Sequence, residues 1–134
     1  PMGMKSGTSP YGNIARPLNP TTLALAYGAT FVARTFSRER DMVSELITKA
    51  IQHKGFSFIH DLSPCVVFNK DVTYDSWNAV AAKLPEEHDT LDRSRAISLA
   101  ESTDPIYQGL FFQEEIPSFD DHVKQVRDGL NQSA

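Results

Sequence analysis

The order of apolar and polar residues predicts alternating strands and helices in the first half of the chain. β-Branched and aromatic residues over 30–36 predict a strand, and a second apolar run predicts another over 56–62. Between them, apolar residues recur every three or four positions from Glu39 to His53. This spacing predicts a helix with one core-facing stripe, capped by Ser37 and ended by Gly55. Strand, helix and strand together form a βαβ unit with parallel strands.

Other patterns predict further elements on both sides of this unit. Asn19 is a suitable N-cap for a short helix over 21–27, with Pro20 in its first turn and Gly28 at its end. Beyond residue 69 the pattern is looser, and it predicts, in chain order, a helix over 74–84, a helix over 90–102, a strand over 106–112 and a helix over 119–130.

These elements predict one α/β domain in three stretches of chain. Residues 1–20 hold four prolines and three glycines and are expected to be an irregular lead-in from a preceding segment. Residues 21–68 form the βαβ core. Residues 69–134 form a C-terminal extension that is helical with a short strand. The length of 134 residues fits a single domain.

Composition and charge exclude several classes of protein. The formal net charge is −4 and basic residues do not cluster, which argues against nucleic-acid binding. No apolar run approaches the roughly 20 residues of a membrane span, so no membrane contact is expected. A single cysteine argues against a disulfide scaffold and favours a reducing, cytoplasmic location.

Cys65 is the only cysteine, and it follows Pro64 at the end of the second predicted strand. Ligands gather at the carboxyl ends of parallel strands, so the position favours a functional role. Three interpretations remain open for the thiol. It could be a buried apolar residue, a nucleophile assisted by His60 or His88, or one ligand of a site whose other members lie elsewhere.

A second group, His88 and Asp89 with Asp92 and Arg93, could be a catalytic or metal cluster. The same residues fit the start of a helix, with Asp89 or Thr90 as N-cap, and we favour this interpretation.

Three further features have structural explanations. The adjacent pair Glu114 and Glu115 points in different directions on a helix or a strand, so a solvated turn or an intersubunit contact is favoured over acid–base chemistry. His122 is expected at the surface, and Trp77 is expected to anchor a core or an interface. The chain has no dinucleotide fingerprint, P-loop, Cys-x-x-Cys or His-Glu-x-x-His motif.

Several segments, taken in order, resemble the second half of the β subunit of 2-oxoacid:ferredoxin oxidoreductases, with the 2-oxoglutarate type most similar. The resemblance rests on TSPYGNI (8–14), PLNP (17–20), ATFVAR (29–34), HKGF (53–56), LSPCV (62–66), FN (68–69), HD (88–89), DR (92–93), PIY (105–107), GLFFQEE (109–115) and PS (117–118). Each segment is weak alone, and the set is specific because it spans nearly the whole chain.

The resemblance implies part of a three-layer fold that binds thiamine diphosphate with Mg²⁺, in a subunit that also carries a [4Fe-4S] cluster. It implies oxidative decarboxylation of a 2-oxoacid to an acyl-coenzyme A, with electron transfer to ferredoxin and an α (or α and γ) partner subunit. It also implies that Cys65 is the fourth cluster ligand, because the Ser-Pro-Cys segment of the family supplies one of four cysteines.

The family's other cofactor motifs are absent from these residues. A Cys-Pro-x-Cys-type segment and a Gly-Asp-Gly motif with a downstream Asn-Asn would precede residue 1. We therefore expect the isolated chain to lack oxidoreductase activity, to bind no cofactor and to self-associate through exposed sheet edges. The alternative function is a non-catalytic α/β interaction or assembly module in which Cys65 is a buried structural residue.

Overall fold

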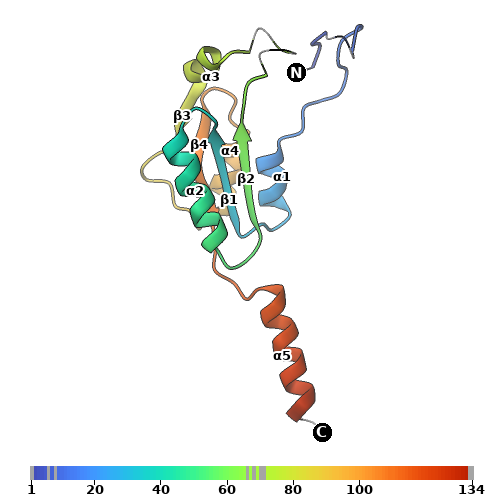
Figure 1. Cartoon of the computed structure of the whole chain (residues 1–134), viewed down its shortest axis with the longest axis vertical. Helices are drawn as coiled ribbons and strands as arrows, with labels where there is room; N and C mark the ends of the chain where they lie inside the picture. The colour runs from blue at the N-terminus through green and yellow to red at the C-terminus, as the bar shows by residue number, and fades with distance from the viewer. Residues whose placement is uncertain are drawn as a thin grey trace.

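The structure of the chain, a computed structural model, describes residues 2–5, 7, 9–65, 67, 69 and 72–132. Figure 1 shows a body of strands and helices from which the last helix extends. The elements are, in chain order, α1 (Pro20–Ala26), β1 (Phe31–Phe36), α2 (Arg40–Gln52), β2 (Ser57–Leu62), α3 (Tyr74–Val80), β3 (Ala81–Lys83), α4 (Arg93–Glu101), β4 (Ile106–Gln113) and α5 (Phe119–Gln132).

The four strands form one sheet in the order β2-β1-β4-β3. β1 and β2 pair in parallel, with Arg34 opposite His60, which confirms the predicted βαβ unit. The sheet as a whole is mixed, whereas the sequence predicted a parallel one. β4 runs antiparallel to β1 and parallel to β3, because the chain returns in the opposite direction after α4. The C-terminal part of the chain therefore supplies an inner strand.

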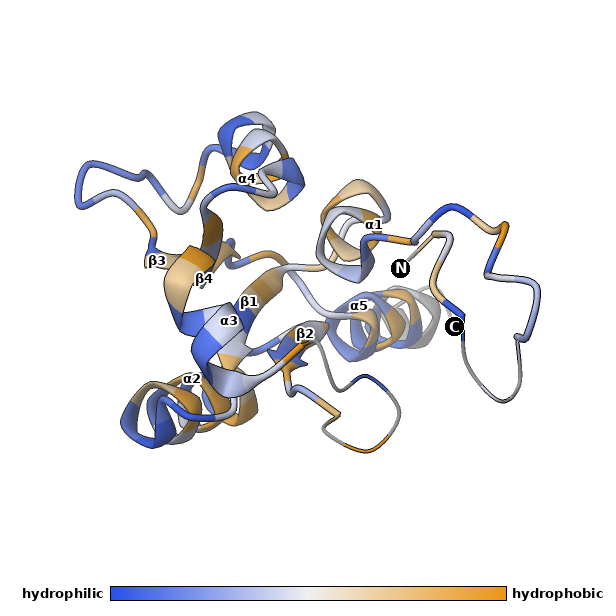
Figure 2. Cartoon of the chain, turned by 90° about the horizontal axis from the view of Figure 1, so that it is seen from above, coloured by the Kyte–Doolittle hydropathy of each residue, from blue (hydrophilic) through white to orange (hydrophobic). Residues whose placement is uncertain are grey.

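The sheet is covered on both faces, which confirms the three-layer arrangement. Figure 2 shows α1 and α4 on one side and α2 on the other. The first layer packs Leu25 of α1 and Leu99 of α4 against Val32 and Phe111. The second packs Leu46 of α2 against the opposite face of β1. Every residue of β1 is buried, since this strand lies between two apolar layers.

A β-bulge in β4 places two consecutive phenylalanines in the same layer. Val32 pairs with Phe112 and the next residue, Ala33, pairs with Leu110, so Phe111 is the extra residue. Successive side chains on a regular strand point to opposite faces, and an inserted residue removes that alternation. Phe111 and Phe112 both pack against α1 and α4 as a result.

The start of α2 and the end of α3 differ from the sequence predictions, whereas the start of α1 agrees. Asn19 caps α1 as expected, with its Oδ1 accepting from Thr22 N at 3.2 Å. Ser37 is not the cap of α2, because the helix begins later and Glu39 occupies the cap position without a side-chain hydrogen bond. The predicted helix over 74–84 ends at Val80. Ala81–Lys83 then forms β3, where pairing with β4 replaces helical hydrogen bonds.

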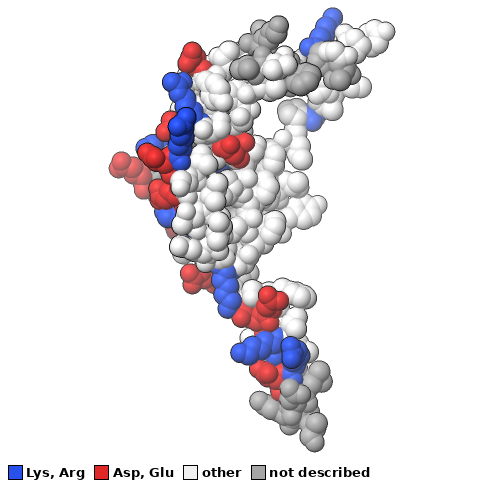
Figure 3. Space-filling view, in the orientation of Figure 1, with Lys and Arg blue, Asp and Glu red and all other residues white. Residues whose placement is uncertain are grey.

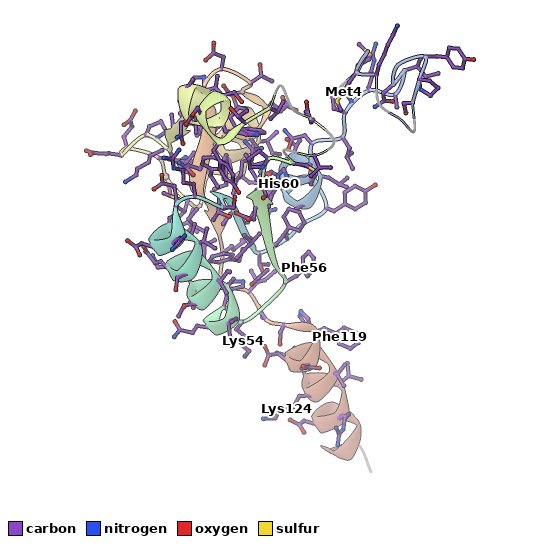
Figure 4. All side chains as sticks on the ribbon, turned by 45° about the horizontal axis from the view of Figure 1, so that its top comes forward. Met4, Lys54, Phe56, His60, Phe119 and Lys124 are labelled. Carbon is purple, nitrogen blue, oxygen red and sulfur yellow. The ribbon has the colours of Figure 1, made fainter. Side chains whose placement is uncertain are left out.

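α5 leaves the body after Gln113 and extends away from it (Figure 1). Its start is fixed by Asp121, whose carboxylate accepts from the Ser118 hydroxyl at 2.8 Å and pairs with Lys54 of the body at 2.8 Å. These contacts hold the pKa of Asp121 well below its usual range. In Figure 4 the labelled Phe56 and Phe119 point to the same side of the molecule, and both rings are exposed.

Gly55 forms the turn between α2 and β2, and we expect Gly55→Ala to destabilise the fold. Its φ of +148° is rare for other residues, and a Cβ would lie 2.3 Å from Thr30 Oγ1 and 2.9 Å from His53 Nε2. These two atoms share a 2.8 Å hydrogen bond that the methyl group would disrupt. The expected loss of unfolding free energy in urea is about 2–4 kcal/mol.

Gly28→Ala is the matched control for the Gly55 variant. Gly28 also has a positive φ, of +84°, but a Cβ there would meet no atom within 4 Å. Its substitution measures backbone strain alone, about 1 kcal/mol. Equal losses at the two positions would show that the collision at Gly55 has no effect.

Candidate functional site

Cys65 lies just beyond the end of β2 and is exposed. The interpretation of Cys65 as a buried structural residue is therefore wrong. Its backbone oxygen accepts a hydrogen bond from Asn69 N at 2.9 Å, which begins a turn. Cys65 thus lies outside the carboxyl end of β2, where ligands gather in α/β sheets.

Within the described residues, no group of three or more His, Cys, Asp and Glu side chains comes close enough to bind a metal. A [4Fe-4S] cluster takes four thiolates, and this chain has one cysteine. This chain could therefore supply at most one thiolate of such a cluster, from the exposed Cys65.

A cleft of about 390 Å³ opens beside the ends of β1 and β2. This volume is within the range of small-molecule sites. Three charged or titratable side chains reach it, Arg34, His60 and Glu101, and its remaining walls are mostly apolar. The apolar and polar residues that complete the lining are Pro17, Leu18, Asn19, Pro20, Leu62, Trp77, Ala100, Ser102, Thr103 and Ile106.

Arg34 is buried at the inner wall of this cleft, with 3% of its surface exposed. Its guanidinium donates to neutral oxygens only: Thr21 Oγ1 at 3.2 Å, Ala100 O at 2.9 Å, Tyr107 O at 3.3 Å and Asn19 Oδ1 at 3.3 Å. None of the ion pairs in the described part of the chain includes Arg34. Burial lowers the pKa of this guanidinium because the charged form loses hydration.

His60 stands opposite Arg34 in the parallel ladder and beside α1 (Figure 4). Its Nδ1 lies 3.1 Å from Thr21 Oγ1, and Thr21 is fully buried. An arginine Nε always donates, so Thr21 Oγ1 accepts from Arg34. The Thr21 hydroxyl keeps its own proton and a second lone pair, so the donor in its contact with His60 Nδ1 depends on the imidazole tautomer. Desolvation, and then the Arg34 charge, lower the pKa of His60.

Because the pKa of His60 is lowered on folding, the unfolded chain binds more protons at this residue than the folded one. The stabilisation from neutral His60 is complete above about pH 6.5 and is lost as the pH falls below that value. We expect His60→Gln to flatten this part of the pH dependence in urea unfolding. His122→Gln, at an exposed position, is expected to leave it unchanged. A His60→Gln slope equal to that of the wild type would contradict the assignment.

The group at 88–93 is structural, as the sequence favoured. The N-cap of α4 is Asp92, whose Oδ1 accepts from Arg95 N at 2.8 Å, rather than Asp89 or Thr90. Asp89 closes the preceding turn, and His88 Nε2 lies 2.8 Å from Phe111 O.

Arg93 and Glu114 join α4 to β4. Arg93 donates to Leu25 O at 2.7 Å, stacks 3.9 Å from the ring centre of Phe112 and pairs with Glu114 at 3.4 Å. Glu114 therefore forms an ion pair with Arg93. This contact agrees with the prediction that Glu114 and Glu115 do not act together in acid–base chemistry.

Trp77 and His122 lie as expected. Trp77 is partly buried, lines the cleft and lies 6.3 Å from the Phe36 ring. His122 is exposed. The sequence reasoning missed Arg34 and Thr21 as members of the site. The available signal was a cation in the middle of a strand that is apolar on both faces.

Two family models match consecutive parts of the chain. Residues 1–60 match the thiamine pyrophosphate enzyme C-terminal TPP-binding domain, and residues 65–128 match the C-terminal region of the pyruvate ferredoxin oxidoreductase β subunit. With the three-layer fold, these matches define the C-terminal portion of a thiamine-dependent enzyme subunit.

Similar proteins identify the family within this class of enzyme subunits. The β subunit of 2-oxoacid:ferredoxin oxidoreductase from Saccharolobus solfataricus is 35% identical over 87% of this chain and 42% of its own length. The 2-oxoglutarate synthase subunit KorB from Archaeoglobus fulgidus is 31% identical over 95% of this chain and 45% of its own length. The chain belongs to the family of 2-oxoacid:ferredoxin oxidoreductase β subunits.

A solved structure agrees with this membership. The 2-oxoglutarate:ferredoxin oxidoreductase from Magnetococcus marinus, determined with 2-oxoglutarate, coenzyme A and succinyl-CoA bound, superposes with a TM-score of 0.91 at 34% identity. The match covers 97% of this chain and 45% of that one. The chain thus spans less than half the length of these relatives.

Proposed function

We propose that the chain is the C-terminal portion of the β subunit of a 2-oxoacid:ferredoxin oxidoreductase that acts on 2-oxoglutarate. The complete enzyme would decarboxylate the 2-oxoacid, pass the acyl group to coenzyme A and transfer the electrons to ferredoxin. The observation that carries this proposal is the similarity to the Magnetococcus marinus enzyme over 97% of the chain, at a TM-score of 0.91.

Within that subunit, Cys65 would be one of four thiolate ligands of a [4Fe-4S] cluster, with the other three supplied from outside this chain. Its exposure and its place beyond β2 support the assignment. The cluster, when bound, would supply one-electron transfer. Cys65 itself would fix the cluster to the end of a strand whose partner β1 is buried on both faces.

Thiamine diphosphate and Mg²⁺ would bind in the complete subunit. Residues 21–68 would contribute the βαβ core of that domain, 69–134 its C-terminal extension and 1–20 the connection to the preceding half. The partners would be an α (or α and γ) subunit and ferredoxin, in the cytoplasm. No helix in the described ranges has the length and apolar character of a membrane span.

Self-association of the isolated chain is part of the same proposal. In Figure 3 the acidic and basic side chains gather on the side that carries α2, and the side that carries α1 and β2 is mostly uncharged. That side exposes Leu23, Tyr27 and Phe56. An apolar surface of this kind favours contact with another protein surface.

The assignment of Cys65 is tested by Cys65→Ser in the complete β subunit assembled with its partner subunits. We expect loss of the cluster, read as loss of its four iron atoms and of its electron paramagnetic resonance signal after reduction. Reduction of ferredoxin by 2-oxoglutarate should fall more than about 100-fold. Ser63→Ala, an exposed neighbour, is the control and should retain both properties.

The same experiment separates the enzyme from the alternatives. If the Cys65→Ser subunit retained its full iron content, Cys65 would not be a ligand of the cluster. 2-Oxoglutarate-dependent reduction of ferredoxin by the isolated chain would contradict its expected inactivity. A small thiol enzyme that uses Cys65 with His60 or His88 would instead show rapid alkylation of Cys65 well below the ordinary thiol pKa of about 8.5.

A further inference from the structure

The cleft beside β1 and β2 contains a buried positive charge, Arg34, that forms no ion pair within the described residues. Arg34 is 3% exposed and its hydrogen bonds go to neutral oxygens. Buried charges in proteins are normally paired with an opposite charge, because hydrogen bonds to neutral groups recover only part of the lost hydration. Arg34 also contacts the carboxyl end of α4 through Ala100 O, and a helix end supplies at most about half a negative charge.

His60 adds a directed donor to this charge. Its Nδ1 lies 3.1 Å from Thr21 Oγ1, which leaves Nε2 as the ring nitrogen that can donate to a ligand in the cleft. The relay from Arg34 through Thr21 holds the imidazole in one orientation. A neutral donor that is held in place next to a buried cation matches the hydrogen-bonding needs of a carboxylate oxygen.

The remaining walls of the cleft indicate what kind of molecule would carry the bound carboxylate. Leu62, Trp77 and Ile106 are apolar and would cover an apolar body. Glu101, an exposed residue, is the acidic residue that lines the cleft, and its charge opposes a dianion more strongly than a monoanion. The cleft therefore disfavours phosphates and dicarboxylates and favours a monoanion.

We propose that this cleft binds a small monocarboxylate with an apolar body, whose carboxylate accepts from His60 Nε2–H next to the charge of Arg34. The site is separate from Cys65 and from the activity proposed for the complete subunit. It can be tested on the chain alone, so its failure would leave the cluster assignment unaffected.

The test uses butyrate as probe and the fluorescence of Trp77, the only tryptophan of the chain and a wall of the cleft. We expect butyrate to change this fluorescence saturably and to raise Tm by about 3–7 °C at ten times its dissociation constant. Butyramide, which lacks the charge, should produce neither effect. Responses to butyrate that equal those to chloride or phosphate at the same ionic strength would overturn the proposal.

Two substitutions at His60, with a control at His122, test whether the butyrate response arises in this cleft. His60→Glu places a carboxylate beside Arg34 within the chain, and we expect a higher Tm without butyrate and no response to it. His122→Glu makes the same change at an exposed position and should retain the butyrate response. His60→Phe removes the donor without adding charge and should weaken butyrate binding at least about tenfold. Unchanged butyrate binding in either folded His60 variant would overturn the proposal.

Discussion

Phe111→Ala is expected to lower the free energy of unfolding by about 3–5 kcal/mol, the largest effect of any single substitution considered for this chain. Phe111 is fully buried at the bulge of β4, where its ring packs between the sheet, α1 and α4. Truncation to alanine removes this apolar contact and leaves a cavity that the neighbouring strands cannot close, since β4 is held by β1 and β3 on both sides.

The measurement is equilibrium unfolding in urea followed by circular dichroism. Phe119→Ala is the control, because Phe119 is 80% exposed in the described structure of the isolated chain. Its loss should stay within about 0.5 kcal/mol. Since domains are typically stable by about 5–15 kcal/mol, this loss would be a large share of the total stability. A loss below 1 kcal/mol would show that the layer between β4 and α4 repacks freely.

Arg34→Met is expected to lower the free energy of unfolding by about 2–4 kcal/mol, the same range as Gly55→Ala. The substitution keeps an apolar stem but removes the donors to Thr21, Asn19 and two backbone oxygens. It also removes the cation above the Phe111 ring, at 5.2 Å. Release of a buried charge opposes these losses, and we expect the lost hydrogen bonds to be larger because they join β1, α1, α4 and β4 at one point.

Arg38→Met is the matched control for the arginine substitution. Arg38 pairs with Asp75 at 3.4 Å, and both side chains are largely exposed. Exposed pairs contribute little, so we expect a change of at most about 0.5 kcal/mol. If Arg34→Met were as stable as Arg38→Met, the buried hydrogen-bond cluster would have no net role in stability, and release of the charge would fully offset it.

The βαβ unit could be predicted from the sequence because its signals are local. The apolar stripe of α2, the strand composition around it and the Asn19 cap depend on neighbouring residues, and each appears in the structure at the expected place. β3 could not be predicted this way. Its three residues follow a helical pattern, and only their pairing with β4, some 25 residues later, selects the strand.

The candidate site likewise has a part that could be predicted from the sequence and a part that could not. The lone Cys65 and its place after a strand could be found from the sequence, and its role as a cluster ligand, which the family resemblance implies, stays a prediction. The cluster of Arg34, Thr21 and His60 joins β1, α1 and β2, so it exists only after the sheet and the first helix have packed. Nothing in the spacing of these three residues along the chain indicates that they meet.

The inner position of β4 has a consequence for how this chain folds. β1 has β2 on one side, and its other edge stays open until β4 arrives from the far end of the chain, where Val32 meets Phe112. During synthesis the βαβ unit therefore emerges from the ribosome with one apolar edge of β1 unpaired. That edge stays unpaired until β4 has been translated. Such long-range pairing slows folding and leaves the nascent chain open to aggregation, so chaperone binding should concentrate on the interval before β4 emerges.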